Sequence, residues 1–93
     1  MNDGLITSTS GVAVQANGDV TLINHGTMSG AGTTILFGAG ADNLVNAGTI
    51  DGDVVLGAGN DTLNGTGGQI IGDVFGGSGD DLFIVSDSDA QLF

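Results

Sequence analysis

The chain of 93 residues carries eleven aspartates and neither lysine nor arginine, so its formal net charge is −11. Without basic side chains it has no patch that could displace counterions from phosphate, which excludes nucleic acid as an electrostatic partner. It has no cysteine, so disulfides cannot stabilise so small a domain and bound metal is the remaining kind of cross-link. No apolar run approaches the length of a membrane span, and we expect no membrane insertion.

The first 19 residues are expected to form an edge coil or cap. The stretch from Met1 to Thr7 has no positively charged segment and no long apolar run, so no cleavable signal peptide is visible. We therefore expect either export by another route or a chain that is part of a longer protein, and we favour the second.

Residues 20 to 85 contain repeated short strands separated by glycine-rich turns. With 19 glycines and no helical heptads, the chain is predicted to be all-β. Alternation within each strand buries every second side chain. The coil at 20–36 has an insertion at 31–33, and the next two coils run over 37–55 and 56–75. The side chains expected to point inward in these three coils are Leu22, Met28, Ile35, Leu44, Ile50, Val54, Leu63, Ile70 and Val74.

Asparagines form a second repeated feature. Asn24 and Asn46 occupy the same place in successive coils and are expected to point inward, where stacked amides can hydrogen-bond along the axis. Their equivalent in the following coil is either Asn64 or Gly65. His25, the only histidine, is expected at a turn rather than at a catalytic or metal site. Residues 86–93 are predicted to be a tail or a truncated coil, which Asp87 and Asp89 keep soluble.

One phrase, G-x-G-x-D followed by an apolar residue two positions on, occurs three times, at 38–44, 57–63 and 77–83. The copies begin at Gly38, Gly57 and Gly77, and such a regular period is typical of a solenoid. Asp42, Asp61 and Asp81 are therefore predicted to stack in register along one edge. Two charges about 5 Å apart repel by about 1 kcal/mol in water and about 3 kcal/mol at an effective dielectric constant of 20. The chain has no basic side chain to offset this repulsion, so an external cation is required.

These turns offer only hard oxygen ligands, which favours Ca²⁺ over zinc, copper or Mg²⁺. Each aspartate supplies a carboxylate, and the glycines let carbonyl oxygens turn toward the same point. We predict that folding is coupled to calcium binding. The glycines expected to shape the metal site are Gly38, Gly40, Gly57, Gly59, Gly77 and Gly79.

Residues 76–84 read G-G-S-G-D-D-L-F-I, which resembles the calcium-binding nonapeptide of repeats-in-toxin (RTX) proteins. In the other two copies Phe37 and Leu56 replace the first glycine. The 19-residue spacing of residues 37–55 is similar to that of calcium-dependent ice-binding repeats in large bacterial adhesins. The resemblance implies a secreted bacterial module that stays unfolded at low calcium, passes through a type I secretion channel and folds outside the cell.

Ice binding and catalysis are the functions that compete with this interpretation. Ice binding needs rows of Thr and Asn beside the calcium turns. The positions that match the Thr are Ala39, Ala58 and Ser78, and those that match the Asn are Ala41, Asn60 and Asp80. Of these six, only Asn60 fits. A second, weaker ion row at Asp51, Asp53 and Asp73 is the alternative to solvated edge charges. No enzyme activity is expected, because the chain has no lysine or arginine to abstract a proton and no histidine other than His25 to stand beside a nucleophile.

The sequence therefore predicts a right-handed parallel β-solenoid of about four coils with calcium turns along one edge. The expected function is that of a calcium-binding structural module, and the alternative is an adhesin-type module that binds a surface or ligand. Open solenoid ends also predict end-to-end self-association.

Overall fold

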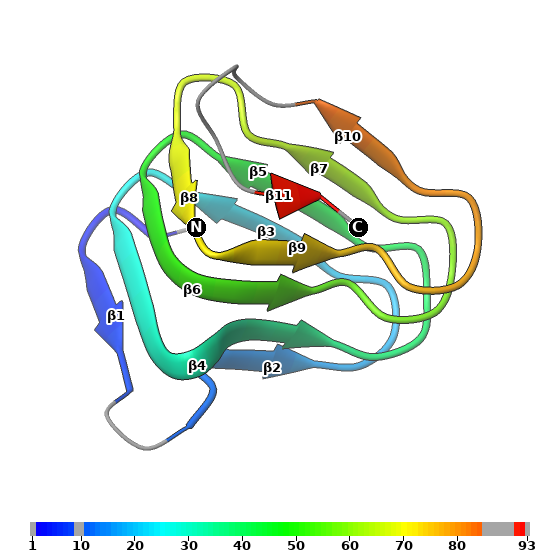
Figure 1. The fold of residues 1–93 in the computed structure, drawn as a ribbon, viewed down its shortest axis with the longest axis horizontal. Coiled ribbons are helices and arrows are strands. Elements are labelled where there is room, and N and C mark those ends of the chain that lie inside the picture. The colour runs from blue at the N-terminus through cyan, green and yellow to red at the C-terminus, as the bar shows by residue number, and fades with distance from the viewer. Residues whose placement is uncertain (1, 9–10, 85–90, 93) are drawn as a thin grey trace.

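The computed structural model describes residues 2–8, 11–84 and 91–92, and all regular structure in them is β. Figure 1 shows the chain winding into stacked coils. The strands are β1 (Leu5–Thr7), β2 (Val14–Ala16), β3 (Thr21–Asn24), β4 (Thr27–Phe37), β5 (Asn43–Asn46), β6 (Thr49–Val55), β7 (Thr62–Asn64), β8 (Gln69–Ile71), β9 (Asp73–Phe75), β10 (Leu82–Ile84) and β11 (Gln91–Leu92).

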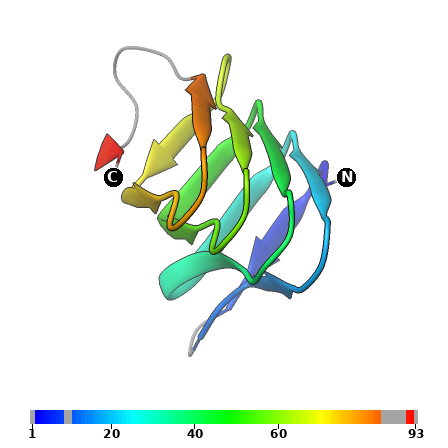
Figure 2. The same cartoon turned by 90° about the vertical axis from the view of Figure 1, so that its right-hand side faces the viewer.

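Every strand pairing in the described residues is parallel, and each strand pairs with its equivalent about one coil away. The fold is a parallel β-solenoid of about four coils, as the repeat period predicted. Figure 2 shows the coils stacked side by side from the N-terminal to the C-terminal end. The described residues contain no helix long and apolar enough to cross a membrane.

Each coil has three faces. The first face is a four-stranded sheet in the order β10-β7-β5-β3. The second face contains β1, the first part of β4, the first part of β6, and β8. The third face contains β2, the last part of β4, the last part of β6, β9 and β11. Because β4 and β6 bend from the second face onto the third, a single sheet covers two sides of the solenoid.

The register confirms the predicted insertion in the coil that contains β4. Thr27 pairs with Thr49, but further along the same two strands Ile35 pairs with Val54, and the register shifts between these pairs. In this stretch β4 is therefore longer than its partner β6. The additional residues lie in the bend between the second and third faces, where they disturb neither strand pairing.

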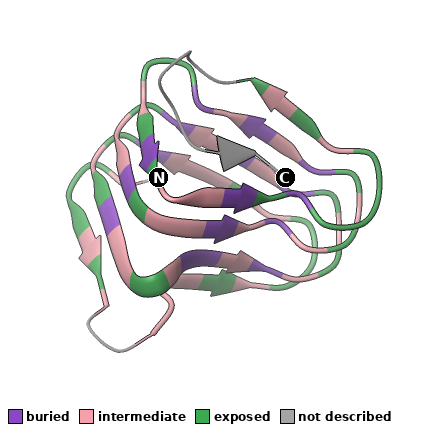
Figure 3. Ribbon diagram, in the orientation of Figure 1, coloured by how far each residue is buried: buried purple, intermediate pink, exposed green. Residues whose placement is uncertain are grey.

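The core is a column of apolar side chains inside the coils. Figure 3 marks the buried residues, polar ones included, in purple along the ribbon. Eight of the nine side chains predicted to point inward are buried, and Leu22, in the first coil, is partly buried against the same cluster. Removing apolar surface from water stabilises a fold by about 25 cal/mol per Å². The burial of this column is therefore the main driving force for stacking the coils.

Two core residues were not predicted. Phe37 and Leu56, which replace the first glycine of the nonapeptide, are both buried in the core cluster, and they stand in register because Leu36 pairs with Val55. In the last coil Gly76 occupies the equivalent position, and a Cβ there would lie 3.0 Å from the ring of Phe83. The larger Phe83 side chain, in register with Leu63, thus fills the volume that Gly76 leaves.

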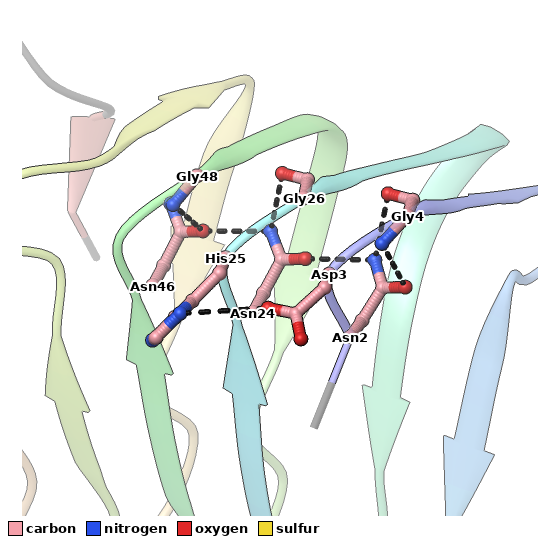
Figure 4. Close-up of polar contacts among 8 residues, drawn as sticks. All are labelled: Asn2, Asp3, Gly4, Asn24, His25, Gly26, Asn46 and Gly48. Carbon is pink, nitrogen blue, oxygen red and sulfur yellow. Dashed lines mark hydrogen bonds and ion pairs between the residues drawn. The ribbon is translucent and has the colours of Figure 1, made fainter.

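The predicted asparagine ladder is present and is longer than expected. The amide of Asn24 donates to the side-chain oxygen of Asn46 at 2.9 Å, and the amide of Asn2 donates to that of Asn24 at 2.9 Å (Figure 4). Val45 pairs with Asn64, so Gly65 stands in register with Asn46 and ends the ladder. The Asn46 amide donates instead to the backbone carbonyl of Gln69 at 3.0 Å.

The two ends of the chain extend this stack. Residues 1–19 contain β1 and β2, which pair with β4 as an incomplete capping coil before the first full coil. Beyond β10 the structure describes only β11, which pairs with β9. The predictions for Asp87 and Asp89 concern positions that lie outside the described residues.

Candidate cation site

The three G-x-G-x-D turns form one corner of the solenoid, where the third face leads into the first. We call residues 17–20, 38–42, 57–61 and 76–81 the aspartate corner. Here the coils approach so closely that a Cβ on Gly59 would overlap the carbonyl oxygen of Gly40. Gly59 also has φ of 118°, a conformation that side chains disfavour. The carbonyl of one turn therefore faces the glycine of the next turn, across the gap between the coils.

Equivalent packing occurs at the other predicted glycines of this corner. Gly57 packs on Gly38, Gly77 on Gly57, and Gly79 on Gly59, in each case with the carbonyl of the earlier glycine toward the later one. Gly38 alone among the six lacks a positive φ. The structure thus places all six predicted glycines at the same corner as Asp42, Asp61 and Asp81.

The three aspartates of the repeated motif, Asp42, Asp61 and Asp81, all point in one direction along the axis. The Asp61 Oδ1 atom accepts a hydrogen bond from the amide of Asp42 at 2.9 Å, and Asp81 Oδ1 accepts one from the amide of Asp61 at 3.0 Å. Asp42 Oδ1 accepts one from the amide of Val20, at 3.0 Å. Each of these aspartates therefore reaches back into the gap that precedes its own coil, so each gap receives one carboxylate of the repeated motif rather than two.

Two of these carboxylates are buried and incompletely paired. Asp42 and Asp61 are only 2% and 1% exposed. No described residue donates a hydrogen bond to the Oδ2 atom of either side chain, and both Oδ2 atoms are inaccessible to solvent. Leaving a buried charged oxygen unpaired is strongly unfavourable, so each atom identifies a place where a positive partner would stabilise the fold.

The burial of Asp42 and Asp61 raises the pKa of both carboxyls. Burial raises the pKa of the Asp61 carboxyl, and the Asp42 and Asp81 carboxylates raise it further, although the hydrogen bond from the Asp42 amide lowers it. Burial likewise raises the pKa of Asp42; the hydrogen bond from Val20 opposes this effect, and the Asp19 carboxylate adds to it. Both carboxyls are thus harder to ionise than an ordinary aspartate unless a cation lies beside them.

Asp19 lies in the equivalent turn of the coil at 20–36, but it was not among the predicted metal ligands, because this turn lacks the full motif. Thr21 pairs with Asn43, so Val20 stands in register with Asp42, and Asp19 with Ala41. The Asp19 Oδ1 atom accepts a hydrogen bond from the amide of Ala41 at 2.8 Å. Asp19 therefore reaches forward into the gap that Asp42 enters from the other side. Only the register between the coils shows that these two carboxylates share a gap.

The remaining acidic residues are arranged differently. Asp53 and Asp73 lie at the bend between the second and third faces, where Asp53 Oδ1 accepts a hydrogen bond from the Asp73 amide at 2.9 Å. Both are half-buried, and Asp51 is exposed. The second ion row thus has no buried, unpaired oxygen to support it among these three residues.

His25 lies at the turn where it was expected. Its Nδ1 atom is 3.6 Å from Asp3 Oδ1, and both side chains are at least half exposed, so a protonated imidazole would form a surface ion pair (Figure 4).

Within the described part of the chain, no three carboxylate, histidine or cysteine side chains converge on one point. A cation in a gap would therefore take most of its ligands from backbone carbonyls and water, with the Oδ2 atoms supplying the charge. That oxygen-only donor set suits a hard divalent ion such as Ca²⁺.

Comparisons of the chain with protein-family models, curated proteins and solved structures give no match.

Proposed function

We propose that this chain is a calcium-binding structural module in which Ca²⁺ ions hold the coils together at the aspartate corner. The observation that carries this proposal is the pair of buried, unpaired Oδ2 atoms on Asp42 and Asp61 in a chain without lysine or arginine. A divalent ion in each gap would reduce the repulsion between successive carboxylates, and in the gaps that Asp42 and Asp61 enter it would also pair with these atoms.

The proposal includes coupling between binding and folding. The gaps exist only when the coils are stacked, so the free energy of ion binding adds to the free energy of folding. Without the ion, a core of ten buried apolar side chains in the described residues must offset both the backbone entropy of 19 glycines and a net charge of −11. We therefore expect the calcium-free chain to be largely unfolded at neutral pH.

The resemblance to RTX repeats extends the proposal to the cell. A chain that remains unfolded at cytoplasmic calcium levels is suited to pass through a type I secretion channel and to fold outside, as a module of a secreted bacterial protein. The match of motif and spacing supports this step, together with the calcium coupling.

The proposal can be tested by titrating Ca²⁺ into an EDTA-treated sample of the wild-type chain and following the far-UV circular dichroism. We expect β-structure to appear with calcium and to disappear on chelation, with Mg²⁺ at the same concentration much less effective. Complete β-structure in EDTA that calcium leaves unchanged, together with no heat of binding by calorimetry, would overturn it.

A pair of variants locates the effect. Asp61→Ala should reduce the calcium response strongly, because it removes the carboxylate from the middle gap, the one between the turns at 38–42 and 57–61. Asp53→Ala removes the same charge at the opposite bend and should change the response little. Equal effects of the two substitutions would contradict the assignment of the site to the aspartate corner.

A further inference from the structure

The gap between the first two coils differs from the others because two carboxylates enter it. Asp19 enters from the first coil and Asp42 from the second. Their hydrogen bonds run in opposite directions across the same gap: Ala41 donates to Asp19, and Val20 donates to Asp42. The two side chains are thus held by backbone amides of facing turns, one on each side of the gap.

The surroundings of these two carboxylates resemble those of the later gaps. A Cβ built on Gly40 would lie 2.7 Å from Asp19 Oδ1 and 2.7 Å from the Gly18 carbonyl oxygen. A carboxylate oxygen and a glycine carbonyl thus lie together against the same glycine. Asp42, with an exposed fraction of 2% and an Oδ2 atom that no described residue pairs, reaches into this gap.

We propose that Asp19 joins Asp42 as a second carboxylate ligand of the Ca²⁺ ion in the first gap, although the repeat motif is missing from the first coil. This inference rests on the proposed function and extends it to a position that motif spacing does not identify. The site would combine the free Oδ2 of Asp42, the Asp19 carboxylate and the Gly18 carbonyl, with water completing the shell.

The three gaps of the aspartate corner then form a natural series that differs mainly at one position. The residue that stands where Asp19 does is Ala41 in the second coil and Asn60 in the third. Asn60 reaches forward as Asp19 does, and its Oδ1 atom accepts a hydrogen bond from the Asp80 amide at 2.9 Å. The first gap has two carboxylates, the second has one, and the third has one carboxylate and one amide oxygen. Because calcium affinity rises with the charge of the ligands, the first gap should bind the ion most tightly.

Asp19→Asn tests the site with little change of shape, because an asparagine oxygen can still accept the hydrogen bond from Ala41. Native mass spectrometry should count the ions bound to each chain, and isothermal titration calorimetry should give their affinities. We expect the wild type to bind one ion per gap, and Asp19→Asn to lose the tightest of them or to bind it about tenfold more weakly or worse. Asp51→Asn removes one exposed charge from the second face and should leave count and affinities unchanged.

A gain-of-charge variant makes the opposite prediction. Ala41→Asp would place a second carboxylate in the middle gap and should strengthen binding there by about tenfold. The amide signals of Val20 and Ala41 in ¹H–¹⁵N spectra provide a local measurement, because these amides bond to the two carboxylates of the first gap. Both signals should move during the calcium titration of a wild-type sample and should respond at higher calcium in Asp19→Asn.

The outcomes separate the two proposals. If the wild type binds no calcium, the proposed function fails, and the first-gap site fails with it. If the wild type binds calcium but Asp19→Asn keeps the same ion count and affinities, Asp19 is not a ligand and this inference is wrong, while the proposed function stands. A lost or weakened ion in Asp19→Asn, with Asp51→Asn unchanged, supports the site.

Discussion

Two corners of the solenoid stack polar side chains in register, and they satisfy those side chains differently. At the asparagine corner, the turns between the first and second faces, Asn2, Asn24 and Asn46 form a continuous chain of hydrogen bonds. At the aspartate corner, Asp42, Asp61 and Asp81 occupy equally regular positions but do not bond to one another's side chains. Each instead uses one oxygen to accept a backbone amide from the preceding coil.

The difference comes from the chemistry of the two groups. A carboxamide carries both donor and acceptor atoms, so a row of them can satisfy itself without charge. An ionised carboxylate has only acceptors, so a row of them leaves one oxygen of each unsatisfied and accumulates charge. The asparagine corner is therefore complete within the protein, whereas the aspartate corner requires a cation from outside. Substitutions at each corner test this contrast.

The largest effect is expected where both corners depend on the same feature, the close approach of successive turns. A Cβ would overlap the preceding turn's carbonyl at Gly59 in the aspartate corner and at Gly48 in the asparagine corner. We expect Gly59→Ala and Gly48→Ala each to destabilise the calcium-bound fold by about 2–5 kcal/mol, measured by urea unfolding. Gly11→Ala, where a Cβ meets nothing within 4 Å, is the control and should change stability little.

Breaking the asparagine ladder at its centre should be the next largest effect. Asn24→Ala removes the hydrogen bonds that join Asn24 to Asn2 and Asn46, and we expect a loss of about 2–4 kcal/mol in calcium. The number of bound ions, counted by native mass spectrometry, should stay the same. Asn43→Ala, at an outward position of β5, should have little effect; a calcium-binding defect in folded Asn24→Ala would contradict the separation of the two corners.

Replacing a buried carboxylate by its neutral isostere should have opposite effects with and without calcium. Asp61→Asn keeps an oxygen to accept the Asp42 amide but removes an uncompensated buried charge, so in EDTA we expect more β-structure, equivalent to about 1–3 kcal/mol. With saturating calcium we expect the variant to be less stable than wild type. Circular dichroism and urea unfolding under both conditions measure the two signs; the same sign in both would refute the charge argument.

Protons should partly replace calcium at the aspartate corner. The pKa values of Asp42 and Asp61 are raised in the fold from an ordinary value of 3.8, so the folded chain binds protons more tightly than the unfolded chain. In EDTA, the stabilisation that comes from protonating these carboxyls should therefore increase as the pH falls through the raised pKa values. It should be complete below pH 3.8 and be lost as the pH rises toward 7.

The β-content measured by circular dichroism in EDTA between pH 7 and pH 4 tests this dependence. In the double variant Asp42→Asn with Asp61→Asn, the dependence should be clearly weaker. A wild-type chain that unfolds further on acidification in EDTA would show that these carboxyls do not govern its stability.

The smallest effect is expected at the opposite bend. Asp53→Asn keeps the oxygen that accepts the Asp73 amide and changes a half-buried charge with no unpaired buried atom. We expect a change within about 0.5 kcal/mol in calcium. A larger loss of stability, accompanied by one fewer bound ion, would instead support a second row of ions at this bend.

Most of the fold could be predicted from the sequence because a parallel solenoid converts sequence spacing directly into spatial register. The regular period of the repeated phrase places Asp42, Asp61 and Asp81 at one corner, and alternation within short strands identifies Leu44, Leu63 and the rest of the core. The insertion at 31–33 was also visible, because the strands on both sides of it keep their pattern. Each of these properties depends on position within a coil, which the repeats specify.

Only the tertiary structure decided which way the polar side chains point along the solenoid axis. Periodicity places an aspartate in its coil but does not say whether its carboxylate reaches toward the coil before or after it. That direction depends on which backbone amide of a neighbouring turn is free to donate, as Val20 is to Asp42 and Ala41 is to Asp19. Asn2 is a different case, because the sequence already carries its signal: Asn2, Asn24 and Asn46 each begin an N-x-G pattern, and the structure joins Asn2 to Asn24 by a hydrogen bond.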